Sequence, residues 1–261
     1  MKTLGFIGAG NMGSALIRGL INTKAIEAKN VYVCGHHPEK LQEFQNELHF
    51  NICSDIAGVI EASDAVLFAV KPYHIEKLLD ECRDLLHGKM VLSVINDYNF
   101  EKYEALLHPN TPHLYIMPNT PSSVGAGVFM FENRHSLPED EHAQIVSMFN
   151  QCGTVVFLPS HLMSAGAAVA GCGPAFIAMV IEALSDAAVK YGIPRKLSYQ
   201  LASQMVLGTA KMQLESGMHP GQIKDGVCSP AGTTILGVQA LEKAGMRSAF
   251  MDAVDAVMSK K

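Results

Sequence analysis

The amino-acid sequence predicts an α/β domain with a mainly parallel sheet, followed by a second domain that is entirely helical. Two observations support this prediction. In the first half of the chain, short apolar runs rich in β-branched residues alternate with segments of helical periodicity, as in βαβ units. After about Pro159 no convincing strand remains, and helical patterns follow one another with glycine and proline between them. We therefore predict a boundary near Ser160, with domains of residues 1–160 and 161–261.

The elements of the first domain are predicted from the spacing of their apolar residues. Strands are expected over Thr3–Ile7, Val31–Cys34, Ala65–Val70, Met90–Ile95, Leu114–Met117, Val128–Phe131 and Thr154–Phe157. Helices are expected over Asn11–Asn22, Pro38–Leu48, His74–Leu86, Asn99–Leu107 and Pro138–Asn150. Connections of this kind bring successive strands into parallel pairing.

The second domain contains one helix that is apolar on nearly every face. Helices are predicted over Leu162–Ala168, Pro174–Tyr191, Arg195–Glu215, His219–Asp225, Ala231–Lys243 and Arg247–Met258. The apolar helix Pro174–Tyr191 must be buried on most of its sides, and a domain of about 100 residues has limited capacity to enclose it. We expect self-association through the helical domain, as a homodimer or higher oligomer. The alternative is a helix held between the two domains of one subunit.

Charge and cysteine usage exclude several classes of partner. The net charge is −5. Proteins that bind nucleic acid usually carry excess positive charge, so we do not expect a nucleic-acid partner. Residues Met1–Gly10 lack the long apolar region of an export signal, and the apolar stretch Ala165–Ile181 is too interrupted by glycine and proline to favour a membrane span. The 6 cysteines and 11 histidines show no CxxC or HxxxH spacing, which predicts reduced thiols, a cytoplasmic protein and no metal site.

A glycine-rich turn directly follows the first predicted strand. Its sequence is Ile7-Gly8-Ala9-Gly10-Asn11-Met12-Gly13, a GxGxxG pattern that runs into a helix. Gly8 permits the tight turn, Gly10 lets the backbone approach a pyrophosphate, and Gly13 allows the helix to pack closely on the strand. The phosphates then accept hydrogen bonds from N–H groups at the helix N-terminus. The pattern predicts a Rossmann-type domain whose residues 7–13 bind a dinucleotide.

The choice between NADPH and NADH is expected at the end of the second strand. An acidic residue there would accept the ribose 2′-OH of NADH, but the sequence is Gly35-His36-His37-Pro38-Glu39-Lys40. His36, His37 and Lys40 are suited to a 2′-phosphate, so we expect NADP(H) as the cofactor, with NAD(H) as the second choice. The alternative is that these side chains belong to an ordinary solvated loop.

A second cofactor-binding segment is predicted after the strand Ala65–Val70. The sequence Ala69-Val70-Lys71-Pro72 ends that strand, and ligands of open α/β sheets bind beyond the carboxyl ends of strands at a switch in strand order. Pro72 forces the chain to turn there and exposes backbone groups to the cofactor. Taken alone, Lys71 is equally compatible with an exposed charge at a strand end.

Further segments make the chain resemble the pyrroline-5-carboxylate reductase family from end to end. The matching segments are Phe6–Gly13, Ala69–Pro72, Met117-Pro118-Asn119-Thr120-Pro121, Gly171–Phe176 and Lys224–Thr234. The last, Lys-Asp-Gly-Val-Cys-Ser-Pro-Ala-Gly-Thr-Thr, is the most diagnostic. The resemblance implies NAD(P)H-dependent reduction of the cyclic imine Δ1-pyrroline-5-carboxylate to L-proline, the last step of proline biosynthesis.

The segment Ser229–Thr234 also has a physical interpretation of its own. Serine is a favoured helix N-cap and proline a favoured first helical residue, so we expect a helix to begin here. The small residues Ala231 and Gly232 would leave the first-turn N–H groups accessible to a carboxylate. The family resemblance implies that Ser229 and the backbone of Gly232, Thr233 and Thr234 hold the substrate carboxylate.

The expected reaction needs few catalytic side chains, because the nicotinamide supplies the hydride and the protein holds the substrate in the correct orientation. The resemblance places the Thr234 hydroxyl near the imine nitrogen, and we predict that Thr234 is the catalytic residue, as a hydrogen-bond donor or proton relay. Asn119 is predicted to contact the nicotinamide or the substrate. Its alternative role is to tie the Pro118–Pro121 turn together.

Three places depart from the family pattern. Ser164 and Ala167 stand where many members have Asp and Thr, and Cys172 replaces a common serine. Asn96-Asp97-Tyr98 follows the strand Met90–Ile95, where the family usually has Ala-Gly and an aliphatic residue. If this loop faces the nicotinamide, Asp97 adds negative charge and Tyr98 adds bulk. Two alternatives therefore stay open: a reductase of a related cyclic imino acid, such as one with a six-membered ring, and a non-catalytic dinucleotide sensor. A sensor would not need the turn at Ser229–Thr234.

Overall fold

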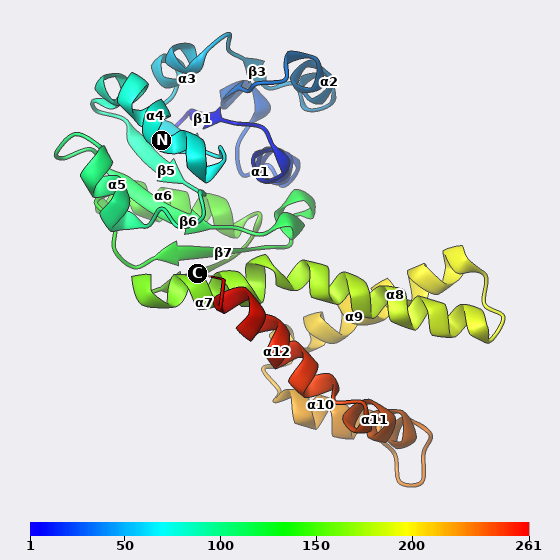
Figure 1. Ribbon diagram of the computed structural model, residues 1–261. Helices are drawn as coiled ribbons and strands as arrows, with labels where there is room; N and C mark the ends of the chain where they lie inside the picture. The colour runs from blue at the N-terminus through cyan, green and yellow to red at the C-terminus, as the bar shows by residue number, and fades with distance from the viewer. Residues whose placement is uncertain (261) are drawn as a thin grey trace. The chain divides into compact units, whose positions relative to one another are not determined.

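The structure is a computed structural model that describes residues 1–260 of the chain (Figure 1). Contacts between residues divide it into two compact units, Met1–Cys172 and the residues from Gly173 onward. The first unit is built on a sheet and the second is helical, so the predicted fold class, an α/β domain followed by an all-α domain, is confirmed.

The first unit is built on an eight-stranded sheet with the order β3-β2-β1-β4-β5-β6-β7-β8. All its pairings are parallel except that of β6 with β7. Strand order reverses between β1 and β4, so their carboxyl ends frame the crevice in which such sheets bind ligands. The strands are β1 Leu4–Ile7, β2 Val31–Cys34, β3 Asn51–Ile52, β4 Ala65–Phe68, β5 Met90–Ser93, β6 His113–Met117, β7 Gly127–Glu132 and β8 Gly153–Leu158.

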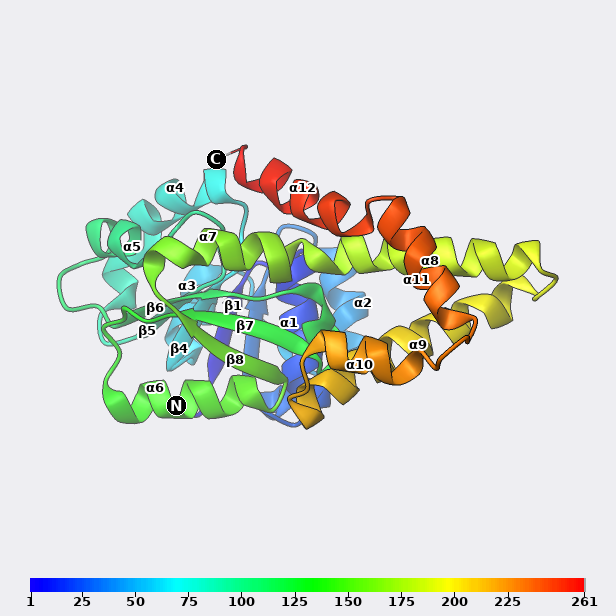
Figure 2. The ribbon, with the colours of Figure 1, turned by 90° about the horizontal axis from the view of Figure 1, so that it is seen from below.

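Helices cover both faces of this sheet because side chains along each strand alternate between the two faces. Phe6 packs into a core with α1, α2 and α6, whereas the next residue, Ile7, packs into a second core with α3, α4 and α5. Figure 2 shows α6 on one side of the sheet and α4 and α5 on the other. The helices are α1 Asn11–Asn22, α2 Pro38–Leu48, α3 Ile56–Ala62, α4 Pro72–Cys82, α5 Phe100–Leu106, α6 Glu139–Asn150 and α7 Met163–Gly166.

Two elements of the first unit were not predicted from the sequence. Strand β3 has only 2 residues, and helix α3 has only 7 and contains Gly58. Periodicity is a weak signal over such short lengths. The start of α3 does carry one local signal, because the Asp55 side chain caps the helix by accepting a 2.8 Å hydrogen bond from the Gly58 N–H.

The segment after Pro159 is helical but packs against the sheet. Met163 of α7 is 4 % exposed and lies in a core cluster with Tyr115 of β6 and Met130 of β7. The chain continues through a π-helical turn, Ala167–Gly171, to Cys172. This packing is why the first compact unit ends at Cys172, whereas the sequence boundary was drawn near Ser160, where strands cease.

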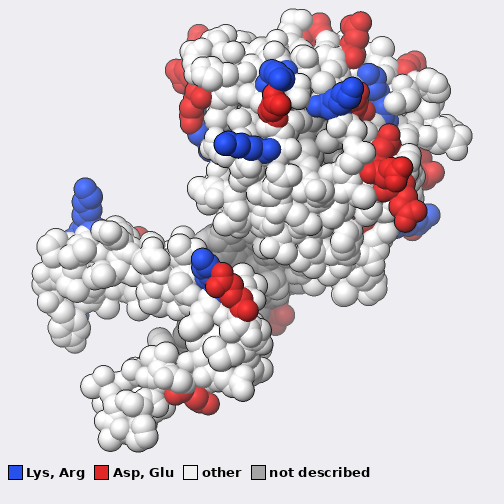
Figure 3. Space-filling model, turned by 180° about the vertical axis from the view of Figure 1, so that it is seen from behind, with Lys and Arg blue, Asp and Glu red and all other residues white. Residues whose placement is uncertain are grey.

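The second unit consists of helices whose apolar side chains are largely exposed in a single chain. They are α8 Gly173–Lys190, α9 Arg195–Ser216, α10 Pro220–Val227, α11 Thr234–Lys243 and α12 Met246–Met258. Ser185 is the only buried residue of α8, and Met179, Leu207 and Leu236 are 68 %, 57 % and 63 % exposed. Figure 3 shows few charged side chains on the visible face of this unit.

This exposure favours the first of the two sequence interpretations of the apolar helix, in which a second subunit covers the side chains that one chain leaves exposed. The stretch Ser160–Lys190 is long and apolar enough to cross a membrane by length and composition; its most apolar window has a mean hydropathy of 1.8, and 6 % of that window is buried. An apolar surface of this size on several helices indicates a protein–protein interface.

A stacked histidine pair makes the stability of the first unit depend on pH. The rings of His135 and His142 lie 3.9 Å apart at an angle of 19°, and neither His135 Nδ1 nor His142 Nε2 has a hydrogen-bond partner. Burial lowers the pKa of both imidazoles, and the neighbouring His135 lowers the pKa of His142 further. Protonation in the folded state would therefore place positive charge on partly buried rings, which a backbone hydrogen bond between His135 and Leu137 offsets only in part.

We expect the midpoint of thermal unfolding to fall as the pH drops from about 7 to about 5. The unfolded histidines bind protons with a pKa of about 6.5. Because the folded pKa values lie lower, the stability contribution of the pair is complete above that pH and is lost below it. The measurement is Tm against pH for the wild type and His142→Gln. An equal slope in both proteins would contradict the assignment.

Candidate active site

The glycine-rich turn is folded as a close contact between β1, α1 and the end of β4. Gly8 has a φ of +104°, and a Cβ there would lie 2.6 Å from the Ala69 carbonyl oxygen. A Cβ on Gly13 would lie 2.2 Å from the carbonyl oxygen of Gly8, so the first turn of α1 can approach the strand only with glycine at this position. A Cβ on Gly10, by contrast, meets no atom within 4 Å. Each glycine therefore has the environment that pyrophosphate binding requires.

A cavity of about 950 Å³ opens over this turn. Its lining carries six cationic or imidazole side chains and no carboxylate. Cationic lining without acidic residues fits the phosphates of a dinucleotide. The residues that line this cavity, called the phosphate cavity below, are Gly8, Ala9, Gly10, Asn11, Met12, Ser14, Ala15, Arg18, Gly35, His36, His37, Lys40, Leu41, Phe44, Ala69, Val70, Lys71, His74, Thr120 and Ser123.

A second cavity of about 410 Å³ adjoins the first and shares His36 with it. It is more apolar, includes Ile7, and contains the acidic groups Asp55 and Glu81. Burial raises the pKa of the Cys34 thiol to about 12, with a smaller contribution from Cys53. Cys34 is therefore neutral at physiological pH, and the apolar lining suits an adenine ring.

The guanidinium of Arg18 is already engaged within the phosphate cavity. It forms two hydrogen bonds with the carboxylate of Glu47 and lies over the ring of Phe44, 5.2 Å from its centroid. The paired Glu47 side chain raises the pKa of Arg18, and Arg18 in turn lowers that of Glu47. The other basic side chains that line the cavity are those of lysine and histidine.

Three of the sequence-predicted cofactor residues lie outside the linings of both cavities. Gly13 serves the packing of α1, and Pro72 is the first residue of α4. The third is Asn119, whose Oδ1 accepts a 2.9 Å bond from the Val128 N–H and whose Nδ2 donates a 3.0 Å bond to the Ala170 carbonyl. Both ends of this amide bond to backbone groups outside the Pro118–Pro121 turn, so its observed role is structural but differs from the tie within that turn that the sequence suggested.

The departing loop after β5 turns its tyrosine away from both cavities. The Tyr98 hydroxyl donates a 2.8 Å hydrogen bond to Glu76 of α4, and the ring packs edge-on against Tyr103, 6.1 Å between centroids. Asp97 has a φ of +66°, in the left-handed region where glycine, the usual family residue, has no steric cost. The Tyr98 side chain thus packs against α4 and α5.

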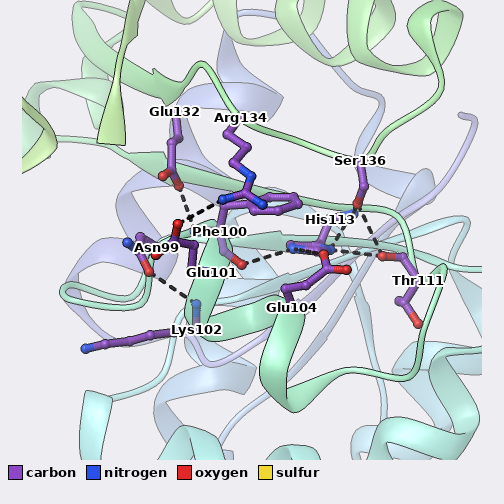
Figure 4. A network of polar contacts seen from close by, with 10 residues as sticks. All are labelled: Asn99, Phe100, Glu101, Lys102, Glu104, Thr111, His113, Glu132, Arg134 and Ser136. Atoms are coloured by element: carbon purple, nitrogen blue, oxygen red, sulfur yellow. Dashed lines mark hydrogen bonds and ion pairs between the residues drawn. The ribbon is translucent and has the colours of Figure 1, made fainter. Parts of the chain in front are cut away.

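A buried polar network fixes the chain just beyond this loop (Figure 4). Glu132 of β7 is fully buried, and its Oε2 accepts a 2.7 Å bond from the Phe100 N–H at the start of α5. The Phe100 ring stacks on His113, 4.3 Å between centroids, and Arg134 lies over its other face. The network therefore couples the loop to the sheet through the first turn of α5.

Replacing Glu132 by alanine is expected to destabilise the protein by about 1–3 kcal/mol, because the buried Phe100 N–H would lose its acceptor. The free energy of unfolding in urea measures this. Glu101→Gln is the matched control, since the exposed ion pair of Glu101 with Arg134 contributes about 0–1 kcal/mol. Equal losses in the two variants would contradict the capping role of Glu132.

The predicted carboxylate-binding turn differs from the sequence prediction in one respect. The prediction that Ser229 caps a helix starting near Ala231 is wrong, because α11 begins at Thr234 with Thr233 as its N-cap. The preceding residues form a separate turn, in which the Gly232 N–H donates to the Ser229 carbonyl oxygen at 2.9 Å and Ala231 has a φ of +57°.

Two first-turn N–H groups of α11, those of Thr234 and Ile235, nevertheless remain available to an anion, whereas the Leu236 N–H donates to the Thr233 carbonyl oxygen at 3.1 Å. Among residues 1–260, neither the Thr233 nor the Thr234 hydroxyl has a hydrogen-bond partner, and both residues are exposed. The turn therefore presents two hydroxyl groups and a helix N-terminus. No group of three or more metal-ligating side chains occurs in the part of the chain that the structure describes.

Comparison with known proteins identifies relatives over almost the whole chain. Residues 160–261 match the family model of pyrroline-5-carboxylate reductase dimerisation, and residues 3–97 match that of coenzyme F420-dependent NADP oxidoreductases. The pyrroline-5-carboxylate reductase of Treponema pallidum is 40 % identical over 260 residues, covering 98 % of both chains. That of Methanosarcina acetivorans is 41 % identical over 255 residues, covering 97 % of this chain and 94 % of its own.

Solved structures give the same result. The Plasmodium falciparum pyrroline carboxylate reductase with NADP bound superposes with a TM-score of 0.88 at 31 % identity, covering 99 % of this chain and 96 % of its own. The Coxiella burnetii pyrroline-5-carboxylate reductase superposes with a TM-score of 0.87 at 30 % identity, covering 99 % and 97 %.

Proposed function

The chain belongs to the pyrroline-5-carboxylate reductase family, and we propose that it reduces Δ1-pyrroline-5-carboxylate to L-proline with NADPH. The observation that carries this proposal is the combination of two sites in one chain. One is a phosphate cavity without carboxylates over a GxGxxG turn, and the other is a turn with unbonded threonine hydroxyls at the start of α11.

The N-terminal unit supplies the cofactor site. The backbone of Gly8–Met12 and the N-terminus of α1 would hold the pyrophosphate, while the apolar second cavity would take the adenine. His36, His37 and Lys40 line the phosphate cavity where a 2′-phosphate would lie, and no carboxylate is present to accept a ribose hydroxyl. We therefore infer that NADPH is preferred and that NADH is the weaker cofactor.

The C-terminal unit supplies the substrate site. The N-terminus of α11, with the backbone N–H groups of Thr233 and Thr234, would bind the carboxylate of the imino acid. The Gly232 N–H, also expected to take part, is instead engaged by the Ser229 carbonyl oxygen. The Thr234 hydroxyl would donate a hydrogen bond to the imine nitrogen and so favour the cationic iminium form. Bound NADPH supplies the hydride, and the protein contributes mainly by holding the imine carbon in reach of it.

Self-association would complete the helical unit. Residues 160–261 match a dimerisation family, and the apolar side chains of α8, α9 and α11 are exposed in one chain. We infer a homodimer or higher oligomer whose interface covers them. The six cysteines are free, which is compatible with the cytoplasmic location that we propose.

A steady-state assay tests the proposed reaction. We expect oxidation of NADPH that depends on pyrroline-5-carboxylate and is faster than with NADH or with the six-membered imino acid. Equal or better turnover of the larger ring would assign the enzyme to that substrate instead. Binding of NADPH without turnover of either imine would favour the dinucleotide sensor.

A further inference from the structure

We propose that His36 and His74 together bind the 2′-phosphate of NADPH in their protonated form, so that the preference for NADPH over NADH depends on pH. This inference rests on the proposed function and goes beyond it by naming His74, a residue outside the glycine turn and the loop after β2. The sequence signal was available: His74 follows Lys71-Pro72 in the first turn of α4.

The geometry brings the two imidazoles together from separate elements. His36 follows β2 and His74 lies on α4, yet their ring centroids are 6.1 Å apart at an angle of 42°. Both rings line the phosphate cavity, and His36 also lines the adjoining apolar cavity. One oxygen that accepts from two nitrogens at about 2.9 Å each places those nitrogens no more than about 6 Å apart. Two rings at this spacing therefore fit one phosphate group.

His36 stands where the two cavities meet, which fixes the position of the phosphate relative to the nucleotide. An adenine in the apolar cavity and a pyrophosphate over the glycine turn would place the adenosine ribose between them. The 2′-phosphate of that ribose would then face the side chains at the boundary. His36 is the titratable side chain that both cavities share, and His74 lies beside it.

The charged groups around the pair make a phosphate the expected ligand. On the phosphate side the cavity presents His37 and Lys40 from the loop and start of α2, and Lys71 from the N-cap position of α4. Arg18 of α1 is held by Glu47. The acidic groups of the surroundings, Asp55 of α3 and Glu81 of α4, line only the apolar cavity. Tyr73 lies against the His74 ring, 4.3 Å between centroids.

Histidine in this position makes binding proton-linked. Lysine supplies positive charge throughout the neutral range, whereas histidine is the side chain whose charge changes between about pH 5 and pH 8. A phosphate monoester is mostly dianionic above its second pKa of about 6. From about pH 7 upward, NADPH binding therefore has to draw protons onto the imidazoles. By linkage, proton uptake means that affinity falls as the pH rises. NADH has no such group, so its affinity should change little.

Calorimetric titration measures this uptake directly. Full-length protein is titrated with NADPH and with NADH at about pH 7.5 in buffers of different ionisation enthalpy, and the dissociation constants are measured from about pH 7 to about pH 8.5. The variants are His74→Gln and His36→Gln. His87→Gln is the matched control, because His87 lies on the exposed turn before β5 and lines neither cavity.

We expect net proton uptake with NADPH but not with NADH, and a fall in NADPH affinity with rising pH. His74→Gln should weaken NADPH binding about tenfold at pH 7, change NADH binding by less than about twofold, and reduce the uptake. Equal weakening for both cofactors, or unchanged uptake in His74→Gln, would overturn the role of His74. Those outcomes leave the reductase assignment standing, whereas wild-type protein that binds neither cofactor would contradict the proposed function as well.

Discussion

Gly10→Val is expected to weaken NADPH binding about a hundredfold while leaving the fold intact. The Cβ position of Gly10 has no atom within 4 Å, and Gly10 lines the phosphate cavity. The Cβ of a valine would therefore meet no protein atom, and its side chain would occupy the space that the pyrophosphate needs. A steric penalty of about 3 kcal/mol weakens binding about a hundredfold. Titration of NADPH followed by fluorescence measures the loss, and circular dichroism with Tm checks the fold.

Gly13→Ala provides the contrast. Its Cβ would lie 2.2 Å from the Gly8 carbonyl oxygen, so α1 would have to move away from β1. We expect a clear fall in Tm for this variant, unlike Gly10→Val. Normal NADPH affinity in Gly10→Val would show that the cofactor does not lie over the glycine turn.

Thr234→Ala is expected to lower turnover about 10- to 100-fold with little change in NADPH affinity. The Thr234 hydroxyl is unbonded in the free chain and stands at the first residue of α11, so its removal leaves no protein group unsatisfied. The loss should fall on the reaction step, because a positioned proton donor stabilises the transition state. Separate measurement of kcat, of KM for the imine and of the NADPH dissociation constant distinguishes these effects.

Thr234→Ser is the matched control, because it keeps the hydroxyl and removes only the methyl group. We expect it to retain most of the wild-type turnover. Weakened NADPH binding in Thr234→Ala, or equal loss in the serine and alanine variants, would contradict the proton-donor role. In either case the threonine would act through packing or on the cofactor side of the site.

Much of the first unit could be predicted because its signals are local. The strand Val31–Cys34 and the helices Asn11–Asn22 and Pro38–Leu48 have the same bounds in the sequence and in the structure. Each is bounded by glycine, proline or asparagine and shows a regular apolar spacing. The glycine turn was equally predictable, since the need for glycine at each of its positions follows from backbone geometry.

The features that escaped prediction depend on contacts between distant parts of the chain. His74 joins the phosphate cavity only because α4 begins beside the loop after β2. The Asn119 side chain hydrogen-bonds to the backbone of Val128 and of Ala170, and no pattern around the Pro118–Pro121 turn predicts these partners. The start of α11 was misplaced because Ser229-Pro230 has the residues of a helix cap but forms a separate turn.

Transfer of deuterium from NADPH labelled at nicotinamide C4 tests the central claim most directly. The protein is incubated with pyrroline-5-carboxylate and the deuterated cofactor, with each of the two C4 positions labelled in turn, and the proline is analysed by mass spectrometry. We predict that one of the two labelled cofactors yields proline carrying one deuterium on the ring carbon that was the imine carbon. Proline without label from both cofactors, or no proline at all, would contradict direct hydride transfer from a cofactor held over the glycine turn.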